Sequence, residues 1–182
     1  MPVLSSDEFI QLENERMNEG RYSITSDINE SLARSFNHEP TSSVEISLQN
    51  KEYIGFIELD NQIVASGFGG IDSQAENGTQ TIYIHSFSVN SSHRGRGLCQ
   101  EIVSEFIQKF STYIIYLTVR TQSDNINESA IKCYEKQGFI MLPQVYRDHY
   151  DGQNTAMIRV PIHKAKKTNK KNKKRRKTRK TR

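Results

Sequence analysis

The segment Asn90–Phe110, NSSHRGRGLCQEIVSEFIQKF, indicates how the middle of this 182-residue chain folds. Apolar residues in it recur at offsets of 0, 4, 5, 8, 9 and 12, the pattern of an amphipathic helix with one apolar face. These residues are Leu98, Ile102, Val103, Phe106, Ile107 and Phe110. Just before them, Arg94-Gly95-Arg96-Gly97 predicts a tight turn, because glycine accepts backbone conformations that other residues avoid. The segment therefore predicts a glycine-rich basic turn that opens a helix.

Strands are predicted on both sides of this segment. Thr81–Val89 (TIYIHSFSV) and Thr112–Thr121 (TYIIYLTVRT) are rich in β-branched and aromatic residues. Strict alternation in the first of them would place Tyr83, His85, Phe87 and Val89 on one face. The local order is thus strand, turn, helix, strand.

Upstream, two apolar runs predict a β-hairpin. Tyr53–Leu59 and Ile63–Ile71 flank the polar turn Asp60-Asn61-Gln62. Glycines at 67, 69 and 70 would weaken an ordinary strand, so we expect a bulge or a close backbone approach there.

Helices are predicted near the two ends of the chain. Ser5 and Glu8 have capping-box spacing, and Asp27 with Glu30 indicates a second helix start. A short helix around 127–137 would end at Gly138. The segments FIML and TAMIRVPI supply the last two strands.

Charge divides the chain into two parts. The last 19 residues, 164–182, hold 13 of the 25 Lys and Arg and no acidic residue, which leaves 12 basic against 21 acidic residues in 1–163, a net of −9. We therefore expect a folded domain over 1–163 and a disordered Lys/Arg-rich tail over 164–182.

Several classes are disfavoured by composition. The longest apolar run, Tyr113–Leu117, is far shorter than the roughly 20 residues of a membrane-spanning helix, and the first residues do not resemble a secretory signal. Cys99 and Cys133 have no metal-ligand spacing, so no metal is expected. We expect both thiols to be reduced, in an intracellular protein that is cytoplasmic or nuclear.

The basic turn suits an anionic group. Glycines there expose successive N–H groups, and a helix N-terminus adds partial positive charge, an arrangement that fits a diphosphate. Taken alone, the turn could equally be a solvated basic surface turn.

The combination resembles the GNAT superfamily of acyl-CoA-dependent N-acetyltransferases. The family signature of Arg or Gln, two residues, Gly, one residue, Gly or Ala appears as Arg94-Gly95-Arg96-Gly97-Leu98-Cys99, with Cys99 departing from the last position. A second hallmark appears as Asn127, Ala130, Tyr134 and Gly138-Phe139. The resemblance covers about residues 5–163 and implies a mixed α/β (α+β) fold with a mostly antiparallel central sheet flanked by helices.

The resemblance also implies site residues. Backbone groups of Phe87, Ser88 and Val89 would pair with the pantetheine arm of acetyl-CoA, and Asn127 would contact that arm. Tyr134 would protonate the departing thiolate, unless its hydroxyl merely reaches water. Backbone N–H groups of the turn would hold the pyrophosphate; these are Arg94, Gly95, Arg96, Gly97, Leu98 and Cys99.

An acceptor amine must lose a proton before it attacks. A lysine-type amine with a pKa near ~10.4 requires about 4.6 kcal/mol for this at pH 7. His85 is the best candidate base, as in some arylalkylamine-acetylating relatives, although a buried histidine without a catalytic role is about as plausible. Tyr83 is a weaker candidate, and the strand itself contains no carboxylate that could serve.

The expected function is therefore transfer of an acetyl group from acetyl-CoA to a primary amine by direct attack, with the acidic domain favouring a cationic acceptor. The alternatives are a catalytically idle GNAT-fold protein that binds nucleic acid through its tail, and an acyl-CoA sensor. The tail has no aromatic residue to stack on bases, so it would contact phosphates without reading sequence. It also resembles a nuclear localisation signal. Acceptor identity and oligomeric state stay open.

Overall fold

The computed structural model describes residues 3–36, 43–72, 80–122, 125–143 and 154–161. The helices are α1 (Ser6–Asn18), α2 (Ile24–Phe36), α3 (Ser43–Gln49), α4 (Leu98–Lys109) and α5 (Glu128–Lys136), with a 3₁₀ turn η1 (Ser91–His93). The strands are β1 (Val3–Leu4), β2 (Tyr53–Leu59), β3 (Gln62–Asp72), β4 (Thr81–Val89), β5 (Ile114–Gln122), β6 (Asn125–Ile126), β7 (Ile140–Met141) and β8 (Asn154–Arg159). The expected tail, 164–182, lies outside the described residues.

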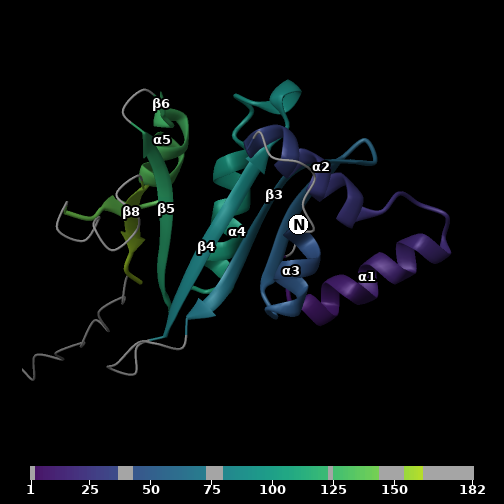
Figure 1. The fold of residues 1–182 in the computed structure, drawn as a ribbon. Coiled ribbons are helices and arrows are strands. Elements are labelled where there is room, and N and C mark those ends of the chain that lie inside the picture. Colours follow the sequence, from purple (N-terminus) through teal and green to yellow (C-terminus); the bar gives the residue numbers. More distant parts are fainter. Residues whose placement is uncertain (1–2, 37–42, 73–79, 123–124, 144–153, 162–182) are drawn as a thin grey trace, which may run out of the picture.

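The strands form one sheet in the order β1-β2-β3-β4-β5-β8-β7, with β6 paired to β5 (Figure 1). Every pair is antiparallel except β4–β5. The parallel pair follows from the helical connection between β4 and β5, which returns the chain to the same end of the sheet. The expected mixed, mostly antiparallel sheet flanked by helices is confirmed.

Helices cover the two faces of the sheet separately. One core joins α4 and α5 to the sheet, with Ile102, Phe106 and Ile82 fully buried. The other joins α1, α2 and α3 to β2 and β3, with Phe9, Ile28 and Phe68 at its centre. The predicted apolar face of Asn90–Phe110 is thus the buried face of α4. Within the described residues, no helix is long and apolar enough to cross a membrane.

Strand β4 has a bulge at Ser86, and this overturns one prediction. Ser86 has φ 53°, and the pairing between β3 and β4 shifts register between Ser66 and Phe68. The extra residue reverses the alternation, because side chains beyond a bulge point to the opposite face. Phe87 and Val89 therefore pack against the α4 core. Tyr83 and His85 remain on the other face.

The glycines of β3 explain this packing. A Cβ at Gly67 would clash with the ring of Phe87, and a Cβ at Gly69 would lie 2.9 Å from Cε1 of Phe106. The close approach predicted from these glycines is confirmed, since only hydrogen fits beneath the two rings.

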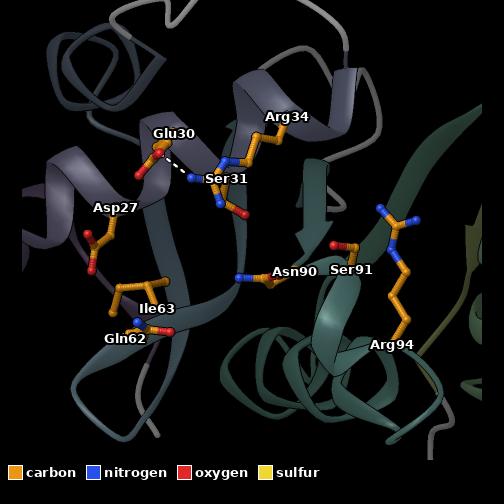
Figure 2. Close-up of a pocket in the computed structure, with 9 residues that line it drawn as sticks. All are labelled: Asp27, Glu30, Ser31, Arg34, Gln62, Ile63, Asn90, Ser91 and Arg94. Atoms are coloured by element: carbon orange, nitrogen blue, oxygen red, sulfur yellow. Dashed lines mark hydrogen bonds and ion pairs between the residues drawn. The ribbon is translucent and has the colours of Figure 1, made fainter.

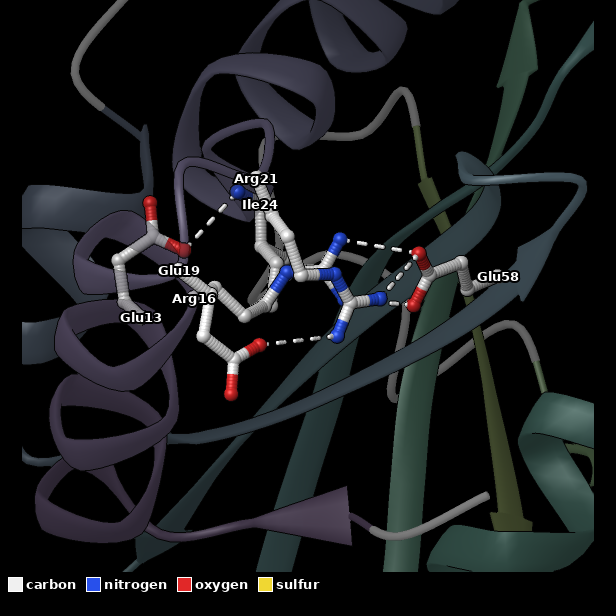
Figure 3. Close-up of polar contacts among 6 residues, drawn as sticks. All are labelled: Glu13, Arg16, Glu19, Arg21, Ile24 and Glu58. Carbon is white, nitrogen blue, oxygen red and sulfur yellow. Dashed lines mark hydrogen bonds and ion pairs between the residues drawn. The ribbon is translucent and has the colours of Figure 1, made fainter.

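The α1–α2 junction is fixed by polar contacts that connect distant residues (Figure 3). The carboxylate of Glu13 accepts hydrogen bonds from the first amides of α2, 2.9 Å from Ile24 N and 3.3 Å from Thr25 N. Arg16, whose side chain is 6% exposed, makes a two-pronged bond to Glu58 at 2.7 and 2.9 Å. Because the cap comes from α1, helix α2 begins at Ile24 and not at Asp27, where local spacing had placed its start.

Candidate functional site

The turn between β4 and α4 presents unpaired backbone amides. Gly95 and Gly97 have φ of 78° and 84°, the left-handed region that favours glycine. Gly97 is the N-cap of α4 and supplies no side-chain cap. The backbone N–H groups of residues 95–99 donate to no backbone acceptor in the described part of the chain. The first amide that does so is that of Gln100, which donates to Gly97 O. The turn can therefore hold an anion by main-chain donation.

One edge of β4 is also unpaired beside this turn. Strands β4 and β5 pair only where Thr81–Tyr83 of β4 lie beside Ile114–Tyr116 of β5. Beyond these residues the two strands separate (Figure 1). On its other edge β4 stays paired with β3 as far as Val89. The backbone edge of residues 84–89 on the β5 side, which includes the predicted Phe87, Ser88 and Val89, is thus available to an extended ligand among the described residues. Arg94 Nε donates to Val89 O at 3.3 Å and ties the turn to the strand end.

Tyr134 lies next to Phe87, where β4 and β5 have separated; we call this place the opening. The residue is 7% exposed, and its ring packs edge-on against Phe87 with ring centroids 6.1 Å apart. Burial raises the pKa of the Tyr134 hydroxyl well above its usual value, and the neighbouring Tyr83 adds a smaller effect in the same direction. The phenol therefore keeps its proton at neutral pH.

Asn127 has a different contact from the one predicted. It is the N-cap of α5, and its side-chain oxygen accepts from Ala130 N at 3.1 Å. The contact of Asn127 with the pantetheine arm stays a prediction.

Cys99 and Cys133 form a disulfide, so the expectation of reduced thiols is wrong for this structure. Helices α4 and α5 pack together and bring the two Cα atoms to 6.3 Å, a separation that a disulfide spans. Their separation of 34 positions in the sequence gave no indication of this. The bond joins the first turn of α4 to the residue before Tyr134.

His85 lies on the opposite face of β4, in a polar and aromatic setting. Its Nε2 is 3.3 Å from Oε2 of Glu52, and its Nδ1 is 3.0 Å from Oγ of Ser86. The Glu52 carboxyl resists ionisation through burial, but hydrogen bonds from His85 and Ser47 outweigh this and lower its pKa. Glu52 precedes β2 in the chain, so sequence reasoning, which sought a carboxylate on the same strand as His85, missed it.

Tyr83 does not act alone on this face. Its hydroxyl is 2.9 Å from Thr118 Oγ1, and its ring stacks on Tyr116 with centroids 5.0 Å apart. The Tyr116 hydroxyl in turn donates to Asp72 Oδ2 at 2.9 Å. The face next to the opening is therefore an aromatic surface with carboxylates at two places, Glu52 and Asp72.

A polar pocket adjoins the turn on its α2 side (Figure 2). Burial raises the pKa of Asp27 in this pocket, and nearby Glu30 adds to that effect against a hydrogen bond from the Ile63 backbone. Arg94 belongs to both the pocket and the turn. The lining residues are Asp27, Glu30, Ser31, Arg34, Gln62, Ile63, Asn90, Ser91 and Arg94. Among the described residues, no group of three or more His, Cys, Asp or Glu could hold a metal ion.

Known proteins share this fold. The chain is similar to an aminoglycoside 6'-N-acetyltransferase from Enterococcus faecium, with 16% identity, a TM-score of 0.59, and coverage of 78% of this chain and 93% of that one. It is similar to an aminoglycoside 6'-N-acetyltransferase crystallised with coenzyme A, with 19% identity, a TM-score of 0.57 and coverage of 78% and 92%. It also resembles a chain of the NatC complex bound to Gag peptide and CoA, with 18% identity, a TM-score of 0.56 and coverage of 76% and 91%.

Sequence comparison adds the family. No curated protein matches the chain significantly in sequence. The sequence profile of the Acetyltransferase (GNAT) family matches residues 18–139, which include the bulged strand, the glycine turn and Tyr134. The chain therefore belongs to the GNAT acetyltransferase family.

Proposed function

We propose that this chain is an N-acetyltransferase that transfers an acetyl group from acetyl-CoA to a primary amine by direct attack. The observation that carries the proposal is the convergence at one opening of the unpaired β4 edge, the unpaired amides of 95–99 and the buried Tyr134. Two solved structures that share the fold contain CoA, which supports an acyl-CoA ligand here.

In this proposal each part of the opening binds one part of acetyl-CoA. Residues 95–99 donate their amides to the pyrophosphate, and Arg94 and Arg96 add positive charge. The β4 edge at 87–89 pairs with the pantetheine arm as an added strand. A β4 amide also stabilises the negative charge that develops on the thioester oxygen during attack. Asn127, at the start of α5, would lie along the same arm.

The two sides of β4 divide the proton chemistry between them. Tyr134 holds a proton that it gives to the leaving thiolate, and its burial keeps that proton in place at neutral pH. His85, on the other side, accepts the proton of the attacking amine. No covalent enzyme intermediate is required, and the pairing of Cys99 with Cys133 leaves neither thiol as a nucleophile.

The surroundings of His85 favour a cationic acceptor. The ladder of stacked rings from His85 through Tyr83 to Tyr116 offers aromatic faces, which attract cations. Glu52 and Asp72 add negative charge, as does the net −9 of residues 1–163. Aminoglycoside acetyltransferases and a peptide-bound NatC share the fold, so polyamines, aminoglycosides and basic peptides are the first acceptors to examine.

An amine panel tests the proposal. The full chain is incubated with acetyl-CoA and, separately, a polyamine, an aminoglycoside, a lysine-containing peptide and a peptide with a free N-terminus, and products are detected by mass spectrometry. We expect acetylated product, with a preference for polycations. Bound acetyl-CoA without product from any amine would refute the proposal and favour the acyl-CoA sensor.

A further inference from the structure

Three polar side chains form a line across the α3 side of the sheet. Ser86 Oγ lies 3.0 Å from His85 Nδ1, and His85 Nε2 lies 3.3 Å from Glu52 Oε2. The serine sits at the bulge of β4, while the glutamate comes from the connection between α3 and β2. Glu52 and His85 are 33 positions apart in the sequence, and no sequence pattern predicts that they meet.

The plane of the imidazole ring is fixed by aromatic packing. Its ring stacks on Tyr83 with centroids 5.2 Å apart and an interplanar angle of 17°, and on Phe68 at 5.8 Å and 23°. The ring is therefore held between two others, and each nitrogen keeps its own polar neighbour.

Glu52 is held from several sides. Its backbone oxygen accepts a hydrogen bond from Ser6 Oγ at 2.7 Å, and its side chain is only 16% exposed. The Ser47 hydroxyl lies beside the carboxyl and, with His85, outweighs the effect of burial to lower the pKa of Glu52. Oε2 is buried, and Nε2 of His85 lies 3.3 Å from it.

These contacts assign the proton on the imidazole. An ionised carboxylate only accepts hydrogen bonds, and Oε2 of Glu52 lies 3.3 Å from Nε2 of His85, so this arrangement favours the tautomer that carries its hydrogen on Nε2. In the neutral ring the other nitrogen then has a free lone pair. That nitrogen is Nδ1, and the hydroxyl of Ser86 is its donor.

We infer that Glu52 is a positioning residue that fixes His85 as the Nε2–H tautomer, and that Ser86 passes the proton of the acceptor amine to His85 Nδ1. This inference rests on the proposed function, because it assumes that His85 is the base. As the amine nitrogen bonds to the thioester carbon, its proton moves to Ser86 Oγ while the Ser86 proton moves to Nδ1. The C–S bond breaks, and the thiolate takes the proton of Tyr134.

The charges balance at each stage. His85 becomes an imidazolium, which the Glu52 carboxylate stabilises at 3.3 Å. Afterwards His85 releases its proton to solvent and the Tyr134 phenolate regains one. The other titratable groups that face this site are the hydroxyls of Tyr83 and Tyr116 and the carboxylate of Asp72. Tyr83 contacts Thr118 Oγ1, and the Tyr116 hydroxyl donates to Asp72.

The tautomer is measured directly by ¹⁵N NMR of the histidine side chains in the full chain. His85→Asn identifies the signals, which is necessary because the chain has 5 histidines. We expect the neutral ring to carry its proton on Nε2 and none on Nδ1, and we expect Glu52→Ala to abolish slow exchange of the Nε2 proton. A proton on Nδ1 in the unaltered chain would overturn the inference, whatever the activity.

Kinetics test the consequence for catalysis. Glu52→Ala and Ser86→Gly should each lower kcat about tenfold or more with little change in KM for acetyl-CoA, and should change the pH profile of kcat. Glycine is chosen at 86 because it removes the hydroxyl and accepts the φ of 53°. Glu45→Ala, which removes an exposed carboxylate on α3, is the matched control and should leave kcat unchanged.

The outcomes separate the two proposals. The expected NMR signals together with an unaltered pH profile in Glu52→Ala would overturn the positioning role and leave the acetyltransferase proposal intact. If the unaltered chain acetylates no amine, the proposed function fails. The ¹⁵N spectra still decide whether Glu52 controls the tautomer of His85.

Discussion

Replacing Gly97 by alanine tests whether the turn before α4 is built for a ligand. Gly97 has φ 84°, and a Cβ there would meet no atom within 4 Å. The change therefore introduces left-handed backbone strain without a clash, at a cost of about 1–2 kcal/mol. For a chain of this size that corresponds to a fall in Tm of about 2–8 °C.

Gly20, at the turn after α1, offers a matched control. It has φ 69° and the same open space for a Cβ, but it lies outside the β4–α4 segment. Gly20→Ala should therefore lose a similar amount of stability. A difference in the Kd for acetyl-CoA between the two variants is then due to where the backbone strain lies and not to how large it is.

Binding of acetyl-CoA is measured by isothermal titration for both variants. If the strained turn relaxes and one amide–phosphate hydrogen bond is lost, the cost of about 1.5–3 kcal/mol weakens binding about tenfold to hundredfold. We expect this for Gly97→Ala and an unchanged Kd for Gly20→Ala. Equal affinity in the two variants, with equal loss of Tm, would refute the assignment of the turn as the pyrophosphate site.

Three further outcomes follow from the same contacts. Tyr134→Phe should lower kcat at least tenfold, while isothermal titration still shows binding of acetyl-CoA. Because burial raises the pKa of Tyr134, the unaltered enzyme should keep this proton donor up to pH ~10. A normal kcat in Tyr134→Phe would exclude Tyr134 as the donor. Reduction of the Cys99–Cys133 disulfide should lower the free energy of unfolding by about 2–4 kcal/mol. Urea denaturation with and without reductant measures this difference. An identical urea midpoint under the two conditions would mean that the thiols are not paired. Asp27→Asn should raise Tm at pH 7, because burial raises the pKa of the Asp27 carboxyl and disfavours its charged form. The difference in Tm should vanish below about pH 4, where the carboxyl is protonated in the folded and the unfolded chain. A higher Tm of the variant that persists below that pH would contradict burial of the charge as the cause.

Local patterns carried much of the fold. The period of Leu98–Phe110 predicted α4, the Ser5–Glu8 spacing predicted the capping box that opens α1, and Gly138 ends α5 with φ 84°. These features depend on residues close together in the chain. The hairpin of β2 and β3 was predictable for the same reason.

What sequence reasoning missed depends on contacts between distant segments. The bulge at Ser86 reversed the faces of β4, since the space for Phe87 is provided by Gly67 on the neighbouring strand. Strands of two residues, such as β1 and β6, are too short to show a period. Helix α3, with seven residues, was also not predicted.

The site divides in the same way. The turn 94–99 and Tyr134 stand in motifs of a few residues. The Cys99–Cys133 disulfide and the packing of Tyr134 on Phe87 bring both beside β4. Glu52 reaches His85 only through the packing of α3 and β2, and Cys99 reaches Cys133 only through the contact of α4 with α5. No spacing rule connects such pairs.

The most direct test of the account is hydrogen–deuterium exchange of the full chain with and without acetyl-CoA. Bound ligand should slow exchange in peptides that cover Phe87–Val89 and residues 95–99, because these amides would gain acceptors. Peptides from α1, on the far side of the sheet from α4, should exchange at unchanged rates. Unchanged exchange over 87–99 at saturating acetyl-CoA would contradict the central claim that this opening is the acetyl-CoA site.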